Sequence, residues 1–551
     1  MKYAIINAKV LSGHENMEAE KKALLVENGR IAAIADDAKE FGHVKTIDIC
    51  GKYLMPGLIN LHVHLPGSGM PSYTKKQNAR TVRLLMGNPV TRTVVFFLCY
   101  KFARTQLMSG VTTIRTVGGL GNVDSRIRDS VNKGRLTGPR VLASNMAVSV
   151  PGGHMAGVLA YEAKTPEDCV RFVDKIAEDK PDLIKIMITG GVLDAKKRGE
   201  PGELKMPPEL VKACCDEAHR LGFKVAAHVE SPEGLKAALE NGVDTVEHGA
   251  FTDEDMVRLF RERGAADICT ISPAVPTALF DPEVSHATEL VQYNSNVVMK
   301  GVIDCAKNGI ENGYPVGLGT DTACPFVTHY DMWRELCYFK KYAGVSSAFA
   351  LHTATEVNAE IAGIADETGA VEVGKSADFL ITEGNPLENL QALRTPSMVV
   401  MRGKVIKKPK VKKIDWSTPW MVQTQRAIAS AYESSAYFDY YKDDLFALLD
   451  SHPGTLFEMN LSILEFFLDK TGIKADIRFT EEFTAPGSGI YGEDLREVIH
   501  PKRANTILED LDLKKPYFQV FARKHGFISN LSIMDLLFNE GPDSIVFLKK
   551  L

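Results

Sequence analysis

Four histidines, one lysine and one aspartate stand at or near the ends of apolar segments that lie far apart in the sequence. They are His62, His64, Lys185, His228, His248 and Asp321. Imidazole and carboxylate groups are common ligands of Zn²⁺ and similar divalent ions. A metal centre built from them could activate a water molecule for hydrolysis, provided that the fold brings the segments together.

The first two histidines, His62 and His64, follow an apolar run in the segment GLINLHVHLPG, which spans residues 57–67. Residues i and i+2 of a β-strand point to the same face, so the two imidazoles should leave the strand end side by side. A His-x-His pair is a weak signal by itself. Its weight comes from the other candidate ligands further along the chain.

Lys185 interrupts the otherwise apolar segment LIKIMITGG. An unpaired ammonium buried in a strand costs several kcal/mol, so this position indicates either a salt bridge or a chemical modification. Reaction of the amine with CO2 would give a carbamate. A carbamate can bridge two metal ions as a carboxylate does.

Each residue also has a purely structural interpretation. A lone histidine at a strand end is often a hydrogen-bonded core residue, Lys185 could pair with a nearby carboxylate, and Asp321 could cap the following helix. The order of the six residues and their places at strand ends favour the metal interpretation.

The elements that must position these residues are strands alternating with helices. We expect eight strand segments, at residues 57–64, 111–119, 140–145, 183–191, 224–229, 245–250, 267–273 and 316–321. Eight such units over roughly 270 residues fit a (β/α)8 TIM barrel, in which all C-terminal strand ends open on one face. A doubly wound sheet is the alternative, but no G-x-G-x-x-G fingerprint follows an early strand.

The sequence suggests three domains in an α/β protein. Residues 1–56 and 366–408 contain short strands that we expect to form one composite β-sandwich, with Asn28-Gly29 as a hairpin turn. Residues 57–365 form the metal-binding barrel, in which the long loop at 65–110 should shape the substrate site. Residues 414–551 form a C-terminal mixed α/β domain, with a helix over 455–470.

Composition narrows the function classes. The 551 residues are 45% apolar and 25% charged, which is typical of a soluble globular protein. The net charge of −5 gives no indication of a basic surface that would bind nucleic acid or an anionic membrane. No apolar run is long enough for a membrane span, and the N-terminus does not read as a signal peptide. Nine cysteines without a C-x-x-C pair indicate reduced thiols and a cytoplasmic location. The expected partner is a small-molecule substrate, and homo-oligomerisation is left open.

The segments LMPGLINLHVHL, LIKIMITGG, VAAHVE, TVEHG and LGTD, in this order, resemble the metal-dependent amidohydrolase superfamily. TGAVEVGKSADFLITEGNPLENL resembles the segment that follows the barrel in that superfamily. The resemblance covers residues 1–408 and implies two divalent metal ions, with zinc expected. By similarity, His62, His64 and Asp321 hold the first ion. His228 and His248 hold the second, and N-carboxylated Lys185 bridges the two.

Within the superfamily, imidazolonepropionases are similar over the barrel but use one metal and lack the bridging lysine. Binuclear Xaa-Pro or Xaa-Arg dipeptidases and N-acyl amino acid hydrolases are more similar. Their PGGH-like segment corresponds to VPGGHMAG, which implies that His154 touches substrate. One departure is Glu230, which stands where many of these dipeptidases have a second histidine, and which could face a cationic substrate group or solvent.

This similarity implies a hydrolase that cleaves a C–N bond in a small substrate such as a dipeptide or an N-acyl amino acid, with Asp321 as the catalytic proton acceptor. The same centre would also serve a lactone, ester or cyclic-amidine substrate. A hydroxide between the metals would attack the carbonyl carbon.

The C-terminal stretches STPWMVQTQRAIASAYESSAYFDYY and PYFQVFARKHGFISNLSIMDLLFNEGP resemble WbqC-like proteins. That family often occurs with polysaccharide biosynthesis, so a role in such a pathway is the alternative function. Its usual histidine-glutamine-proline opening is absent here, which implies a partial domain. The polar residues of this region fit a site and helix or turn caps equally well: His525, Asn530, Asp535 and Asn539.

Overall fold

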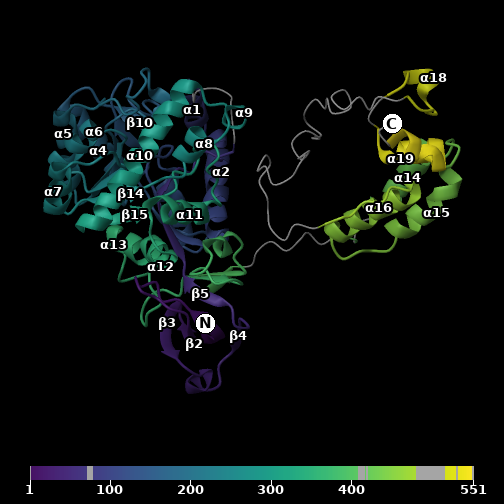
Figure 1. Cartoon of the computed structure of the whole chain (residues 1–551), viewed down its shortest axis with the longest axis horizontal. Coiled ribbons are helices and arrows are strands. Elements are labelled where there is room, and N and C mark those ends of the chain that lie inside the picture. The colour runs from purple at the N-terminus through teal and green to yellow at the C-terminus, as the bar shows by residue number, and fades with distance from the viewer. Residues whose placement is uncertain are drawn as a thin grey trace. The chain divides into compact units, whose positions relative to one another are not determined.

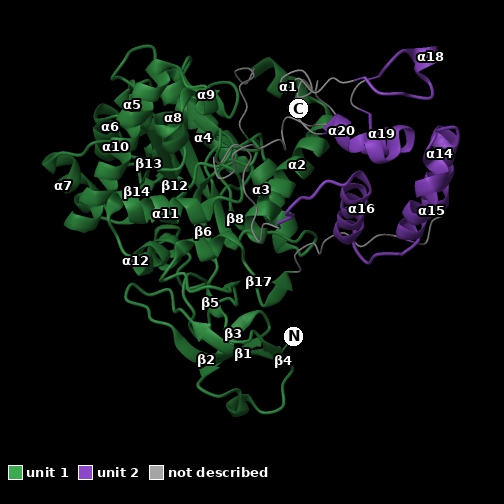
Figure 2. Cartoon of the chain, turned by 45° about the vertical axis from the view of Figure 1, so that its right-hand side comes forward, with its two compact units in different colours: residues 1–407 green, residues 408–551 purple. Residues whose placement is uncertain are grey.

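The structure, a computed structural model, describes residues 2–70, 79–406, 416, 420–478, 516–528 and 531–548. The chain forms two compact units, residues 1–407 and 408–551, which Figure 2 shows in different colours. Each unit has its own hydrophobic core. All the candidate metal ligands belong to the first unit.

One sheet of the first unit combines strands from both ends of that unit. Its order is β18-β17-β16-β5-β1-β2-β3, with β4 beside β1. The strands are β1 (Lys2–Val10), β2 (Glu20–Glu27), β3 (Arg30–Ala35), β4 (Thr46–Asp48), β5 (Tyr53–Pro56), β16 (Phe379–Thr382), β17 (Met398–Met401) and β18 (Lys404–Ile406). The two ends join where β16 pairs antiparallel with β5, with Leu380 opposite Met55. In Figure 1 the N-terminal strands of this sheet lie together at one end of the first unit.

The hairpin predicted at Asn28-Gly29 is confirmed. Glu27 pairs with Arg30, which leaves Asn28 and Gly29 as a two-residue loop between β2 and β3. Their φ angles are 51° and 84°, as the turn preferred in such hairpins requires. A side chain at Gly29 would also lie 2.9 Å from the carbonyl oxygen of Arg402, so close packing excludes a Cβ there.

The centre of the first unit consists of parallel strands alternating with helices, so the α/β class is confirmed. Each of the eight expected segments contains a strand. These strands are β6 (Leu58–Val63), β7 (Val111–Thr116), β8 (Arg140–Leu142), β11 (Leu183–Met187), β12 (Lys224–Val229), β13 (Thr245–His248), β14 (Ala266–Cys269) and β15 (Val316–Leu318). The sequence did not predict two short strands, β9 (Ala147–Ser149) and β10 (Ala160–Glu162). β9 pairs with β11, and β10 pairs with β9.

Parallel pairing runs through β6-β7-β8 and through β11-β12-β13-β14-β15. Hydrogen bonds connect the outer strands of the two series. The amide of Asp321, just after β15, donates to the carbonyl of His62 at 2.9 Å, and the amide of Asp182 donates to the carbonyl of Ala143 at 2.7 Å. The first of these bonds places the ends of β6 and β15, and with them two candidate ligands, next to each other.

Helices cover these strands, and several begin with side-chain caps. Thr165 caps α4 and Ser231 caps α6, each accepting a hydrogen bond from a backbone amide of the first turn. The longer helices are α3 (Val123–Asn132), α4 (Pro166–Glu178), α5 (Pro208–Arg220), α6 (Pro232–Glu240), α7 (Glu254–Arg263), α10 (Glu289–Asn312) and α11 (Met332–Ala343). The shorter ones are α8 (Ala274–Leu279), α9 (Pro282–Ser285), α12 (Ser347–His352) and α13 (Asn358–Ile361).

The long connection after β6 contains α1 (Ala79–Gly87) and α2 (Pro89–Met108), while residues 71–78 lie outside the described residues. No single helix among the described residues is long and apolar enough to cross a membrane. Only α1 and α2 taken together meet that criterion, and they are bent by 106° relative to each other.

The described part of the second unit is helical. It contains α14 (Trp420–Tyr432), α15 (Phe438–Leu449), α16 (Leu456–Thr471), α18 (Ala522–His525), α19 (Ile533–Glu540) and α20 (Ser544–Leu548). The helix predicted over 455–470 is confirmed as α16. Its Met459, Phe466 and Phe467 are buried, whereas Leu456, at the start of the helix, is 45% exposed.

Two of the polar residues singled out in this unit have structural partners. Asp535 accepts a hydrogen bond from the Tyr517 hydroxyl at 2.6 Å, and the Asn539 side chain donates to the carbonyl of Asp535 at 2.7 Å. Asn530 lies outside the described residues.

Candidate metal centre

The four histidine rings lie against one another at the strand ends. The ring centroids are 5.2 Å apart for His62 and His64, 4.7 Å for His62 and His248, and 4.7 Å for His228 and His248. Oδ1 of Asp321 lies 3.4 Å from Nε2 of His62 and 3.3 Å from Nε2 of His64. The fold therefore brings together five of the six residues predicted from the sequence, from β6, β12, β13 and the end of β15.

Three of the histidines use one ring nitrogen for a hydrogen bond within the protein. Nδ1 of His62 bonds to Glu247 at 2.8 Å, Nδ1 of His64 to the carbonyl of Gly118 at 2.9 Å, and Nδ1 of His248 to the Thr270 hydroxyl at 2.7 Å. The Nε2 atoms of His62 and His64 face Asp321 instead. Such bonds through Nδ1 orient metal-binding imidazoles in proteins.

The donor atoms form two overlapping groups. Those of His62, His248 and Asp321 lie within 4.8 Å of one another, and so do those of His228, Glu230 and His248. His248 belongs to both groups. Each group could hold one cation, and the two cations would then lie next to each other on either side of His248.

Lys185, the sixth residue, lies on β11. β12 separates β11 from β13, the strand that ends at His248. The Lys185 side chain is among the largest fully buried ones, and its Nζ has no hydrogen-bond partner among the described residues. Burial lowers the pKa of this amine to about 8. The salt bridge considered from the sequence is therefore not formed.

Burial also keeps the imidazoles of His62, His228 and His248 neutral. It lowers the pKa of His62 to about 4, and it lowers the pKa values of His228 and His248 well below the ordinary value. For Asp321, burial by itself raises the pKa, but nearby His62 and His64 outweigh it and hold the pKa well below its usual range. Neutral imidazoles and an ionised carboxylate are the forms that bind metal ions.

Beneath these ligands lies a buried ion pair. Glu247, next to His248 in β13, accepts a hydrogen bond from Arg115 at 2.6 Å as well as contacting His62. Arg115 also donates to the carbonyl of Leu61 and to the Thr245 hydroxyl. Burial raises the pKa of Glu247, but Arg115 and His62 more than reverse this shift and keep the carboxylate ionised.

This ion pair gives a prediction for stability. Arg115→Met should lower the free energy of unfolding of the first unit by about 3–5 kcal/mol, because Glu247 would be left as a buried charge without its main partner. Urea unfolding followed by fluorescence measures the loss. Arg258→Met is the matched control, since Arg258 is exposed and its ion pairs on α7 should contribute less than about 1 kcal/mol. Equal losses in the two variants would contradict this role for Arg115.

His154 lies against the second group of ligands. Its ring stacks on that of His228 at 4.2 Å with an interplanar angle of 4°, and its Nδ1 bonds to Asp194 at 2.7 Å. Glu230 follows β12, and its Oε2 accepts a hydrogen bond from the amide of Val192 at 3.0 Å. Burial, with Asp321 nearby, raises the pKa of Glu230 to about 8.

Sequence reasoning missed the residues that support these ligands. They are Glu247, Arg115, Thr270, Gly118 and Asp194. Glu247 and Arg115 did carry a signal, because each is a charged residue inside an apolar strand segment, as Lys185 is. Gly118 acts through its backbone, which no side-chain pattern reveals.

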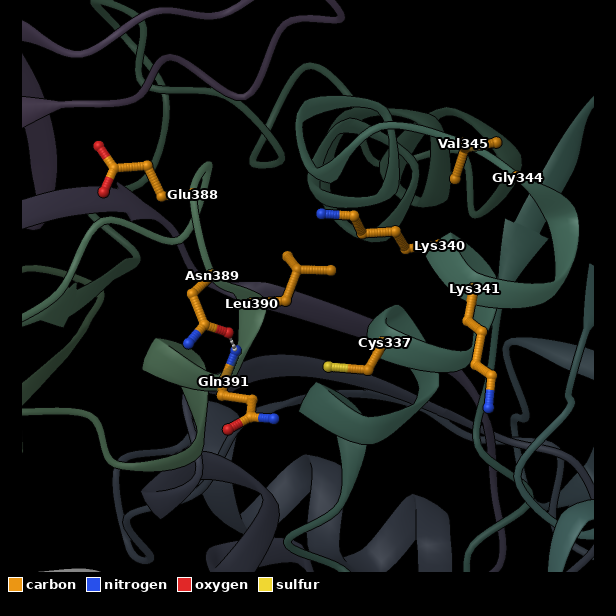
Figure 3. Close-up of a pocket in the computed structure, with 9 residues that line it drawn as sticks. All are labelled: Cys337, Lys340, Lys341, Gly344, Val345, Glu388, Asn389, Leu390 and Gln391. Carbon is orange, nitrogen blue, oxygen red and sulfur yellow. Dashed lines mark hydrogen bonds between the residues drawn. The ribbon is translucent and has the colours of Figure 1, made fainter.

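A separate hollow of about 340 Å³ lies between the end of α11 and residues 388–391. Figure 3 shows Lys340 and Lys341 on one side of it and Asn389, Leu390 and Gln391 on the other. It contains none of the predicted site residues.

Comparison with known proteins places the first unit in a family. The model of the amidohydrolase family matches residues 53–406, which is more than half of the chain. The chain belongs to the amidohydrolase family. This amidohydrolase is therefore a hydrolase acting on carbon–nitrogen bonds, as its sequence indicated. The model of the WbqC-like protein family matches residues 399–547, so the second resemblance is confirmed too.

Relatives of this amidohydrolase include proteins named for their activity. The ochratoxinase of Aspergillus niger is 26% identical over 460 residues, covering 74% of this chain and 87% of the relative. An imidazolonepropionase of Pseudomonas putida is 25% identical, covering 61% and 80%.

Solved structures are also similar to this chain. A prolidase candidate from Bifidobacterium longum is 36% identical with a TM-score of 0.65, covering 75% of this chain and 96% of that one. A Xaa-Pro dipeptidase with methionine bound in its active site is 27% identical with a TM-score of 0.64, covering 74% and 100%.

Proposed function

We propose that this amidohydrolase is a binuclear metal-dependent enzyme that cleaves the amide bond of a small substrate, such as a dipeptide or an N-acyl amino acid. The observation that carries the proposal is the convergence of two groups of donor atoms, sharing His248, beside a buried lysine amine without a partner. The similarity to a Xaa-Pro dipeptidase and to a prolidase candidate supports an amide substrate.

The proposal includes a closed (β/α)8 barrel at residues 57–365, flanked by a composite β-sandwich from residues 1–56 and 366–408. Two hydrogen bonds support closure of the barrel. The bond between Asp321 and His62 links the end of β15 to β6, and the bond between Asp182 and Ala143 links the start of β11 to the end of β8. A barrel would also explain why ligands from four strands meet on one side.

Two divalent ions, with zinc as the expected metal, suit the residues present. His62, His64 and Asp321 would hold the first ion, and His228 and His248 the second. The fit is supported by the Nε2 atoms of His62 and His64, which both face the Asp321 carboxylate. It is also supported by the imidazoles of His62, His228 and His248, which burial keeps neutral. When bound, two such ions lower the pKa of a shared water and polarise the substrate carbonyl.

Lys185 would be N-carboxylated and bridge the two ions. Its neutral amine would attack CO2, forming an N–C bond and releasing one proton, which leaves an anionic carbamate. Burial favours this step, because it lowers the amine pKa to about 8 and leaves Nζ without a competing partner. The carbamate would supply the bridging anion that no other described side chain provides at this position.

In the reaction, Asp321 would accept the proton of the attacking water and deliver it to the leaving nitrogen. Its carboxylate is ionised at neutral pH, and its Oδ1 lies within 3.4 Å of Nε2 of both His62 and His64. His154 would orient the substrate, since Asp194 fixes its ring beside His228.

We further propose a cytoplasmic enzyme that acts on a small-molecule substrate. All nine cysteines are free thiols, and Cys214 and Cys215 are adjacent and buried without forming a disulfide. This pattern suits a reducing compartment.

The test is a hydrolysis screen with the full chain loaded with Zn²⁺. Dipeptides, including Xaa-Pro and Xaa-Arg, and N-acyl amino acids form the first panel, and lactones, esters and imidazolone compounds the second. We expect turnover in the first panel that EDTA abolishes and Zn²⁺ restores. Turnover confined to the second panel, or none at all, would contradict the proposed amide substrate.

A further inference from the structure

The two helices of the connection after β6, α1 and α2, expose apolar side chains around the corner where they meet. These side chains form what we call the corner patch: Leu84, Leu85, Val90, Val94, Phe97 and Leu98. Val90, Val94 and Phe97 are four and three positions apart, so they lie on one face of α2, and they are 55–72% exposed. The Thr91 hydroxyl donates to the carbonyl of Leu85 at 2.6 Å, which joins the two helices at the corner. Exposed apolar groups gathered in this way are typical of a binding surface.

The opposite face of α2 belongs to the core of the first unit. Val95, Phe96 and Cys99 are buried there, and the Tyr100 hydroxyl donates to the carbonyl of Thr137 at 3.1 Å. The two helices are also bent by 106° relative to each other. The pair therefore presents the corner patch on the surface of the unit and cannot cross a bilayer without opening the core.

The charge around the corner patch has one sign. α1 and α2 contain five basic residues and no acidic one, although the whole chain has 70 acidic and 65 basic residues. Lys101 comes four residues after Phe97, so it lies one turn further along the same face of α2. Four of the five basic residues form no ion pair with another described residue: Arg83, Arg92, Lys101 and Arg104. The net charge of the chain hides this segment, because acidic residues elsewhere outweigh it.

Apolar side chains among unpaired cations match the surface of an anionic bilayer. Leucine, valine and phenylalanine enter the boundary between headgroups and acyl chains, while lysine and arginine reach the lipid phosphates. A second copy of this chain matches the patch less well. A symmetric contact through the corner patch would bring the basic residues of both copies together, and like charges facing each other oppose association.

We propose that the corner patch binds the chain reversibly to the surface of an anionic lipid bilayer. Its apolar side chains supply the insertion, and the basic residues of α1 and α2 supply the attraction to the headgroups. The binding is independent of the proposed hydrolysis, because no candidate metal ligand belongs to either helix. It adds a place at the membrane surface to the proposed cytoplasmic enzyme.

The test is co-sedimentation of the full chain with two kinds of vesicle. One kind is phosphatidylcholine alone, and in the other about a third of it is replaced by phosphatidylglycerol. We expect the anionic vesicles to bind the chain about tenfold or more tightly than the neutral ones, and we expect most of this difference to disappear between about 0.1 M and 1 M NaCl. Equal binding to both kinds, or no binding to the anionic vesicles, would overturn the proposal.

Val94→Glu should weaken binding to the anionic vesicles by about tenfold or more, because a carboxylate would replace an apolar group at the bilayer surface. Val373→Glu is the matched control and should bind like the parent chain, since Val373 lies outside the corner patch and is 62% exposed, against 63% for Val94. Lys101→Glu should cause a similar loss, whereas Lys212→Glu, the same change on exposed α5, should not. Unchanged binding by Val94→Glu or by Lys101→Glu would overturn the proposal.

Light scattering without lipid distinguishes a bilayer from a second copy of the chain. The parent chain and Val94→Glu should have the same molecular mass and the same unfolding temperature, because Val94 is exposed. An assembly of the parent chain that Val94→Glu dissociates, without binding to the anionic vesicles, would make the corner patch a contact between copies and would overturn the proposal.

Discussion

Replacing Lys185 with alanine is expected to lower kcat/KM by about 10³-fold or more, because the proposed carbamate would bridge the metal ions that stabilise the transition state by several kcal/mol. The Lys185 side chain is fully buried in β11 and has no hydrogen-bond partner among the described residues, so replacing it breaks no hydrogen bond that holds the fold. A loss of activity would therefore indicate a role at the metal centre. The measurement is steady-state hydrolysis of the substrate found in the screen, with and without added acetate or propionate.

A short carboxylate should fill the space of the missing carbamate and restore part of the activity of Lys185→Ala. Lys212→Ala, which removes an exposed lysine of α5, is the control and should neither lose activity nor respond to carboxylate. Full activity of Lys185→Ala would exclude the carbamate bridge. So would a loss that tracks unfolding in circular dichroism and that no carboxylate relieves.

Asp321→Asn should lower kcat for the amide substrate by about 10³-fold, since general acid–base groups contribute 10² to 10⁴. The amide has nearly the shape of the carboxylate but neither accepts a proton at neutral pH nor carries the charge that faces His62 and His64. The decisive comparison is between an amide and a nitrophenyl ester of the same acid. The ester's leaving group departs without protonation, so its hydrolysis should lose much less.

Asp216→Asn, an exposed change on α5, serves as the control for the loss of a carboxylate. Metal content measured on both variants separates the two roles proposed for Asp321. Equal losses for ester and amide, with both metals retained, would contradict proton delivery by Asp321 while leaving its role as a ligand.

The candidate ligands could be located from the sequence because their positions follow from strand geometry. His62, His228, His248 and Asp321 each come at the end of an apolar strand, and parallel strands place such ends on one side of the sheet. The alternation of strands and helices likewise predicted the eight central strands. The hairpin at Asn28-Gly29 followed from the backbone preference of those two residue types.

The rest depends on contacts between distant segments. Glu247 and Arg115 are 132 positions apart, and only the neighbouring strands reveal that they form one ion pair under His62. The stacking of His154 on His228 and the bond from His154 to Asp194 arise from loops, where no periodicity constrains the side chains. β9 and β10 follow β8 without a helix between them, so the alternation of strands and helices does not reveal them.

The most direct test of the account is the number of metal ions bound by the full chain. The protein is loaded with excess Zn²⁺ in the presence of bicarbonate, freed of unbound metal by gel filtration, and analysed by plasma mass spectrometry against its protein concentration. A binuclear centre predicts two zinc ions per chain. One ion or none per correctly folded chain would contradict the binuclear centre and, with it, the bridging role of Lys185.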